Sequence, residues 1–439
     1  MRILVDSGCY DLCNMGDVAM LQVAVERLHK LWPMALIEVI TNKPTILSQL
    51  CPKTYAIRGD GRHIWFYDRN ILGKVYKMLP GKIEEPIKKL EQLSRRFYPS
   101  LYSGLVQFKL KIRRKNTEAI QEFLDAFMNT DLLVISGAGD INDHFANFAM
   151  TVLELLEIAN RQGIPTAMLS QGIGPIENTR LFKKAKAVLP KVNLIAIRER
   201  ETSFDLLKSL GVAEDNILFT GDDAIEPAYN SRPAKAGKYI GVNLRISSYS
   251  QATDKHIETI GNVIQNCGIK YSCPIMPIPI SFYENESDSR IIQRITGNYF
   301  SQHNINRPEE IINKVSNCKI VITGSYHSAV FALSQGIPAI TLYKTAYYKN
   351  KFAGLAKQFG CGCELISMDD NHFARKLKES IDFAWQTSDI LRPRLLEAAE
   401  NQIEAAQSAY QQLYTMLESQ KSKKNHIFSH QRFSGAYTK

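Results

Sequence analysis

The sequence predicts an α/β protein with two Rossmann-like domains that face each other across a cleft. Short apolar runs rich in branched residues alternate with longer helical patterns along the chain, which is typical of βαβ units around parallel sheets. The alternation breaks once, at residues 230–238, where small polar residues, Pro and Gly indicate an interdomain linker. A chain of 439 residues is also too long for one ordinary core and fits two domains.

The linker divides the chain into residues 1–232 and 238–390. In the first domain, apolar runs predict strands at residues 2–7, 36–40, 132–136, 166–170, 194–198 and 217–220. In the second, they predict strands at 239–244, 271–276, 319–323 and 338–343. We expect a helix at 374–385 and a separate closing helix at 391–420 that packs back across the domain boundary. The basic segment 421–439 is predicted to be disordered.

The charge of the chain is positive and unevenly distributed. The net charge is +10, with cations concentrated in residues 74–115 and again after residue 420. Leu105, Phe108, Leu110 and Ile112 interleave with cations, which predicts peripheral contact with an anionic membrane surface. The alternative is an ordinary solvated helical face. The segment expected to contact the membrane runs from Lys109 to Lys115. Nucleic acid is not expected as a partner.

Other bulk features narrow the class of protein. No apolar run approaches the roughly 18 residues that a membrane span needs, and the first residues lack the pattern of a secretory signal. We therefore expect a cytoplasmic protein, held at the inner face of the membrane if the basic segment binds lipid. The eight cysteines form no repeated CxxC pair, so neither a metal site nor a disulfide framework is expected.

Glycine-bearing turns follow three predicted strands of the first domain. In parallel sheets ligands bind beyond the carboxyl ends of the strands, where helix N-termini attract anions. The spacing is not that of the GxGxxG dinucleotide motif. In the first turn, a turn residue at Asn14 and a helix cap at Asp17 are the alternative to ligand contact. The candidate residues in these turns are Asn14, Gly16, Asp17, Gly137, Gly139, Gln171 and Gly172.

Two arginines end strands on opposite domains. Arg198 follows the strand at 194–197 and Arg245 the strand at 240–244. The planar guanidinium group donates two parallel hydrogen bonds to a carboxylate or phosphate, so the pair is suited to clamp an anion. Charge pairing along the next helix is the alternative for Arg198.

His327 lies between a buried-looking strand and an apolar helix. At a helix N-terminus the dipole favours the neutral imidazole, which accepts a proton near neutral pH. A buried histidine with a purely structural role is the alternative. The neighbouring Ser325 and Tyr326, and Lys344 after the next strand, reach the same edge of the sheet.

A resemblance to a known family rests on the segments 8–17, 136–139, 171–175, 198–203, 221–224, 242–245, 327–332 and 336–338. In these segments the chain resembles the polysaccharide pyruvyl transferase family. The resemblance implies a GT-B-like fold and transfer of pyruvate from phosphoenolpyruvate to two hydroxyls of a sugar, forming a ketal. His327 would be the general acid/base and Arg198 and Arg245 would hold the donor. Where the family has an arginine this chain has Ser325, so Lys344 or another basic residue is expected to replace it.

Other activities fit the same cleft. One alternative is a GT-B glycosyltransferase or sugar-nucleotide enzyme, and another is a non-catalytic sugar-binding relative. The pyruvyl transfer reaction would use phosphoenolpyruvate as co-substrate, with no metal and no further cofactor. Its acceptor would be a saccharide of a surface polysaccharide such as an exopolysaccharide, either free or as a lipid-linked precursor. The sequence is compatible with both a monomer and a homo-oligomer.

Overall fold

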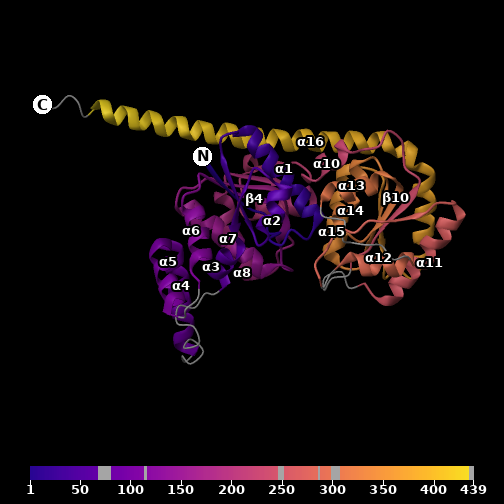
Figure 1. The fold of residues 1–439 in the computed structure, drawn as a ribbon, viewed down its shortest axis with the longest axis horizontal. Helices are drawn as coiled ribbons and strands as arrows, with labels where there is room; N and C mark the ends of the chain where they lie inside the picture. Colours follow the sequence, from indigo (N-terminus) through magenta and orange to yellow (C-terminus); the bar gives the residue numbers. More distant parts are fainter. Residues whose placement is uncertain (68–80, 113–115, 246–251, 285–286, 298–306, 435–439) are drawn as a thin grey trace.

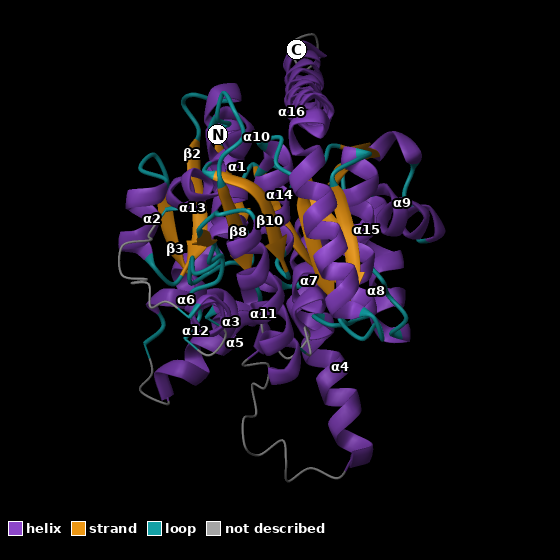
Figure 2. Cartoon of the chain, turned by 90° about the vertical axis from the view of Figure 1, so that its right-hand side faces the viewer, coloured by secondary structure: helices purple, strands orange, loops and turns teal. Residues whose placement is uncertain are grey.

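Two parallel sheets, each covered by helices on both faces, form the body of the protein (Figures 1 and 2). The computed structural model describes residues 1–439 except 68–80, 113–115, 246–251, 285–286, 298–306 and 435–439. The two sheets belong to two domains that lie side by side, as the sequence predicts. The chain is therefore a doubly wound α/β protein with two Rossmann-like domains.

The N-terminal sheet has the strand order β3-β2-β1-β4-β5-β6-β7, and all neighbouring strands are parallel. Its central strands are almost fully buried because helices cover both faces, so their sequences are continuous apolar runs. The strands are β1 (Arg2–Asp6), β2 (Leu36–Thr41), β3 (Tyr55–Arg58), β4 (Leu132–Ile141), β5 (Thr166–Ile173), β6 (Leu194–Ile197) and β7 (Ile217–Phe219). The helices are α1 (Met15–Leu31), α2 (Pro44–Leu50), α3 (Gly59–Tyr67), α4 (Gly81–Phe97), α5 (Pro99–Ile112), α6 (Glu118–Met128), α7 (Ala146–Arg161), α8 (Thr179–Val188), α9 (Arg200–Ser209) and α10 (Ile225–Asn230).

The C-terminal sheet has the order β12-β11-β10-β8-β9, again with parallel neighbours. Its strands are β8 (Tyr239–Asn243), β9 (Ile275–Pro277), β10 (Cys318–Thr323), β11 (Ala339–Tyr343) and β12 (Cys363–Ser367). The helices are α11 (Asp254–Lys270), α12 (Asp288–Thr296), α13 (Pro308–Ser316), α14 (Tyr326–Ser334) and α15 (Ala346–Phe359). Residues that follow the carboxyl ends of both sheets meet at the domain boundary.

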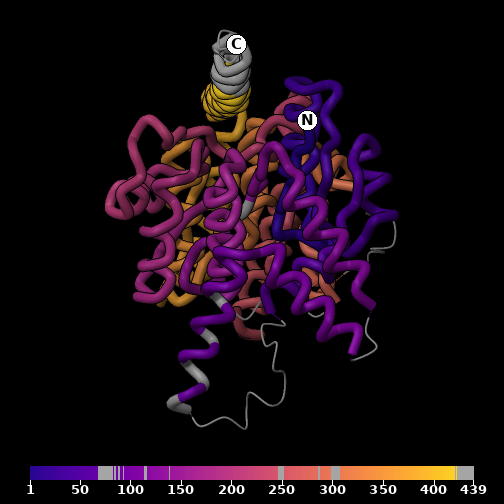
Figure 3. The backbone as a smooth tube through the Cα atoms, turned by 90° about the vertical axis from the view of Figure 1, so that its left-hand side faces the viewer, coloured from indigo at the N-terminus to yellow at the C-terminus, as the bar shows by residue number. Residues whose placement is uncertain are grey.

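The C-terminal part of the chain differs from the prediction. A single helix, α16 (Phe373–Ser434), replaces the two separate helices and includes most of the segment predicted to be disordered. Pro393 does not end it, because Leu395 and Ala399 directly beyond the proline are buried in the core and hold that turn in place. Figure 1 shows α16 crossing from one domain to the other, and Figure 3, which views this helix nearly end-on, shows it on the outside of the molecule. Leu413 of α16 packs against the first domain.

The start of α1 joins the domains next to the cleft. Met15 and Met20 belong to the same apolar cluster as Ile280 of the second domain. The backbone N–H of Met15 donates to Ile280 O at 3.0 Å, and that of Phe282 donates to Cys13 O at 2.8 Å. These contacts fix the first turn of one domain against the other.

Helices α4 and α5 pack against each other at the outer side of the first domain (Figure 1), and Figure 2 shows α4 projecting from it. Of the basic residues predicted to contact a membrane, Lys109 is buried, while Arg113, Arg114 and Lys115 lie outside the described residues. No helix in the described part of the chain combines the length and apolarity of a membrane span.

Candidate active site in the interdomain cleft

A cleft with a volume of about 970 Å³ lies between the two domains at the carboxyl ends of their strands. Residues from both domains line it, as expected for ligand binding in doubly wound folds. It brings together the larger part of the residues predicted from the sequence, namely Asn14, Asp17, Gly139, Arg198, Arg245, Ser325, Tyr326 and His327.

His327 lies between two carboxylates. Its Nδ1 is 3.9 Å from Oδ1 of Asp17 in the opposite domain, and its Nε2 is 3.7 Å from Oδ2 of Asp222. The imidazole is buried and enters the cleft from the first turn of α14. A proton that this imidazole accepts during a reaction would lie next to two carboxylates, which suits a general base.

The first turn of the chain holds this arrangement in place. The side chain of Asn14 caps α1 by accepting hydrogen bonds from the N–H groups of Gly16 and Asp17. Gly16 packs directly under the imidazole, because a Cβ built on it would lie 2.0 Å from Cγ of His327. Gly16 therefore makes room for the imidazole, while Asp17 provides its carboxylate partner.

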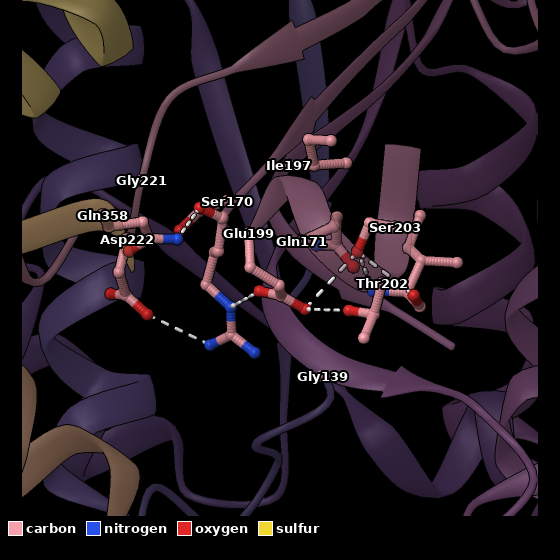
Figure 4. A network of polar contacts seen from close by, with 12 residues as sticks. Gly139, Ser170, Gln171, Ile197, Glu199, Thr202, Ser203, Gly221, Asp222 and Gln358 are labelled. Atoms are coloured by element: carbon pink, nitrogen blue, oxygen red, sulfur yellow. Dashed lines mark hydrogen bonds and ion pairs between the residues drawn. The ribbon is translucent and has the colours of Figure 1, made fainter. Parts of the chain in front are cut away.

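Asp222 connects His327 to Arg198 through one carboxylate oxygen. Its Oδ2 accepts a hydrogen bond from Nη1 of Arg198 at 3.0 Å, and Glu199 lies on the other side of the guanidinium at 3.8 Å (Figure 4). The same oxygen of Asp222 also faces the imidazole of His327. Burial alone raises the pKa of Asp222, but His327 and Arg198 outweigh this effect and hold the pKa below its ordinary value. Asp222 is thus a carboxylate shared by the histidine and the arginine.

The predicted glycines and Gln171 make room for the side chains of the site or hold the neighbouring strands together. A Cβ at Gly139 or Gly172 would lie 2.7 Å from Nη2 of Arg198, so both glycines make space for the guanidinium. The amide of Gln171 donates to two backbone carbonyls of the sheet, and Gly137 packs against Met20. Gly16, Gly137, Gln171 and Gly172 are not among the residues that line the cleft.

The structure places Lys344 outside the cleft. Its ammonium group forms an ion pair with Asp369 at 3.2 Å, and it does not line the cleft. Lys351 lines the cleft instead, on α15. A Cβ at Gly139 would be 2.7 Å from Nζ of Lys351 as well as from Nη2 of Arg198, so two cations converge on this point. The sequence contains no motif around Lys351, although it follows an aromatic pair at the start of α15.

Asp140 is a second group that the sequence analysis did not single out. It lines the cleft at the end of β4, next to Gly139. Burial and the neighbouring Asp17 raise its pKa to about 6, although Lys351 and Arg198 oppose the shift. A carboxyl group with such a pKa is partly protonated near neutral pH and can act as an acid.

Aromatic side chains cover one side of the cleft. The rings of His144 and Tyr347 lie 5.9 Å apart, and Tyr347 also contacts Tyr348 at 5.4 Å. The hydroxyl of Tyr326 is buried and finds no hydrogen-bond partner in the described structure, and burial raises its pKa well above the ordinary value. It therefore remains a donor for a ligand. Within the described residues no cluster of three or more His, Cys, Asp or Glu is suited to hold a metal ion.

Replacing Asp140 with Asn is expected to stabilise the protein at pH 7 and to have little effect below pH 4. The pKa is about 6 in the folded state and about 4 in an unfolded chain. The native state therefore loses stability as the pH rises between these values, and the loss persists above pH 6. The expected gain at pH 7 is roughly 2–3 kcal/mol in the free energy of unfolding. Urea titrations at both pH values measure it, with Asp205→Asn on the exposed face of α9 as the control. A gain that is equal at both pH values contradicts the assignment.

Comparison with known proteins assigns the chain to a family. The model for polysaccharide pyruvyl transferase matches residues 14–343, which include every cleft residue predicted from the sequence. The chain belongs to the polysaccharide pyruvyl transferase family. A curated relative, the amylovoran biosynthesis protein AmsJ of Erwinia amylovora, is 22% identical over 415 residues, covering 87% of this chain and 92% of AmsJ. As a member of this family, the chain is a transferase of polysaccharide modification.

Solved structures of other enzymes share its GT-B-type fold. The UDP-GlcNAc 2-epimerase of Neisseria meningitidis has a TM-score of 0.52 at 12% identity, covering 92% of this chain and 99% of that enzyme. The UDP-GlcNAc 2-epimerase of Methanocaldococcus jannaschii has a TM-score of 0.52 at 14% identity, covering 92% and 97%. A glycosyltransferase of Rickettsia africae has a TM-score of 0.52 at 10% identity, covering 95% and 98%. At these identities the similarity concerns the fold alone.

Ser325, at the position where the resemblance leads us to expect an arginine, lies in the cleft. Ser325 precedes α14, and its backbone N–H donates to the hydroxyl of Thr323 at 2.8 Å. Residue 325 therefore contributes no charge to the cleft, whereas Lys351 lines the same cleft from helix α15.

Proposed function

We propose that this member of the family transfers pyruvate from phosphoenolpyruvate to two hydroxyl groups of a saccharide, forming a pyruvate ketal. The observation that carries the proposal is the convergence of Arg198 and Lys351 beside Asp140 and the imidazole of His327 in one cleft. The donor carries a carboxylate and a phosphate, and the reaction needs both an acid and a base. The saccharide would belong to a surface polysaccharide or its lipid-linked precursor, in keeping with the name of the relative AmsJ.

Three cations would hold the donor. Arg198 and Lys351 converge near Gly139, and Arg245 lines the cleft from the second domain. Arginine suits carboxylate and phosphate through its planar fork, and lysine provides a compact charge. Because the guanidinium of Arg198 is already fixed by Asp222 and Glu199, little conformational entropy is lost when the donor binds.

The reaction redistributes two protons. In the first half, one acceptor hydroxyl loses a proton to His327 as its oxygen bonds to C2 of the donor, and the methylene carbon gains a proton from Asp140 and becomes a methyl group. In the second half, the bond between C2 and the phosphate oxygen breaks and the second hydroxyl bonds to C2. Its proton goes to the carboxylate of Asp140, while His327 returns its proton to the departing phosphate. Both side chains regain their starting states, and no water is consumed.

The environments of the two groups fit these roles. The pKa of Asp140 is raised to about 6, which supplies a protonated carboxyl. Carboxylates flank His327 on both sides and lie next to the positive charge that forms there midway. The aromatic wall around Tyr347 offers apolar faces on which sugar rings pack. The proposed acid, base and donor site thus surround a common space.

Phosphoenolpyruvate is expected to raise the melting temperature of the protein, and Lys351→Met to weaken this effect at least about tenfold in ligand concentration. The matched control is Lys349→Met, an exposed lysine of the same helix. Stabilisation by a sugar nucleotide without any response to phosphoenolpyruvate supports the GT-B glycosyltransferase or sugar-nucleotide enzyme instead. Stabilisation by the saccharide alone, with no release of phosphate, indicates a non-catalytic relative.

A further inference from the structure

An outward apolar stripe runs along α5. Leu101, Leu105, Phe108 and Ile112 follow one another at spacings of four, three and four residues, so they lie on one face of the helix. They are exposed, with Leu101 at 66%, Phe108 at 65% and Ile112 at 67%. The opposite face, which includes Tyr102, packs into the domain. Helix α5 is therefore apolar toward both the domain and the solvent.

Helix α4 also exposes apolar residues. They include Leu90, Leu93 and Phe97, which share one face of the helix by their spacing, and the guanidinium of Arg161 of α7 lies over the ring of Phe97 at 4.4 Å. More than half of the large apolar side chains that the described structure exposes lie in α4, α5 and the turn between them. Single exposed apolar residues are ordinary, but a concentration of this kind marks a contact surface.

Ion pairs hold this helix pair on the domain. Arg95 donates to Glu154 Oε1 at 2.7 Å and to Trp65 O at 2.8 Å, and Arg96 pairs with Glu157. The two arginines face α7 and are therefore not part of the outward surface. The exposed apolar side chains therefore lie on helices that are anchored to the domain.

The charges on the outward surface select the partner. Among the described side chains of α4 and α5, the exposed charged ones are Lys89 and Lys111. Glu91 of α4 is half-buried, and α5 contains no acidic residue. In a symmetric dimer the same surface would face itself, bringing like charges together. An anionic lipid surface instead attracts lysines and accommodates apolar and aromatic side chains at its interface.

We propose that the outward face of α4 and α5 is a docking surface for an anionic membrane leaflet. Apolar side chains of α5 enter the boundary between headgroups and acyl chains, while Lys89 and Lys111 contact the headgroups. The contact is thus carried mainly by the apolar stripe, in contrast to the expectation from the sequence, which assigned it to the segment from Lys109 to Lys115.

Flotation of the full chain with lipid vesicles tests the proposal. Wild type is expected to float with vesicles of phosphatidylcholine and phosphatidylglycerol, less in high salt, and little with phosphatidylcholine alone. Leu101→Glu/Phe108→Glu is expected to lower the partition coefficient at least about tenfold, since each change removes apolar burial and adds a negative charge. The matched control Ile269→Glu/Ile390→Glu changes residues exposed at 79% and 74% on other helices, and should float like wild type.

Two outcomes overturn the proposal. The first is a flotation assay in which wild type does not float, or in which Leu101→Glu/Phe108→Glu floats as well as the control double variant while both keep the wild-type melting temperature. The other is a wild-type dimer in light scattering that Leu101→Glu/Phe108→Glu converts to a monomer without vesicles, which assigns the surface to a second copy of the chain.

Discussion

His327→Ala is expected to lower acceptor-dependent release of phosphate from phosphoenolpyruvate by about 10²–10⁴-fold, the usual contribution of a positioned acid or base. The imidazole lies between Asp17 and Asp222 in the cleft and is the group assigned to accept the hydroxyl proton. Phosphate release under saturating donor and acceptor measures the effect. His372→Ala, at an exposed histidine before α16, is the control and should retain activity.

A second variant tests whether activity depends on the position of the His327 imidazole as well as on its presence. Gly16→Ala keeps His327 but adds a Cβ only 2.0 Å from its Cγ, so the imidazole must leave its place between the carboxylates. Activity should fall nearly as far as in His327→Ala, while Gly104→Ala, where a Cβ meets open space, should not change it. Full activity of His327→Ala refutes the assignment of the base, and full activity of Gly16→Ala refutes the need for this placement.

The strands that the sequence did not predict are both at sheet edges. β3 and β12 each end a sheet and pair on one side only. Their side chains are mostly half-buried or exposed, unlike the fully buried β5 and β6. Because edge strands need less apolar surface, they lack the continuous apolar run by which the central strands were predicted. Prediction from the sequence therefore identified the central strands of each sheet and missed part of its margins.

The residues of the site also divide into those that the sequence predicts and those that only the structure shows. Strand ends can be recognised in a sequence, so the sequence alone places Arg198, Arg245 and His327 at the rim of the cleft. Asp140 gains its raised pKa from burial and from Asp17 in a distant turn, and Lys351 enters from the middle of a helix. These properties depend on how separate elements pack and leave no local pattern.

Arg198→Ala is expected to destabilise the protein by about 3–5 kcal/mol and to abolish binding of phosphoenolpyruvate. The guanidinium is almost fully buried, and its removal leaves the buried carboxylates of Asp222 and Glu199 without their cation. Urea unfolding measures the loss of stability, and a thermal shift with phosphoenolpyruvate measures binding. The matched control is Arg180→Ala, at an exposed position of α8, which should change neither.

A double variant separates the two roles of Arg198. Arg198→Ala/Asp222→Asn replaces one stranded carboxylate with a neutral amide, so part of the lost stability should return. Binding of phosphoenolpyruvate should not return, because the cation that would hold the donor is still absent. If the double variant regains binding together with stability, Arg198 acts only as a structural partner of Asp222, and the donor must be held by Lys351 and Arg245. If Arg198→Ala unfolds at the same urea concentration as wild type, the network of Arg198, Asp222 and Glu199 does not contribute to the stability of the cleft.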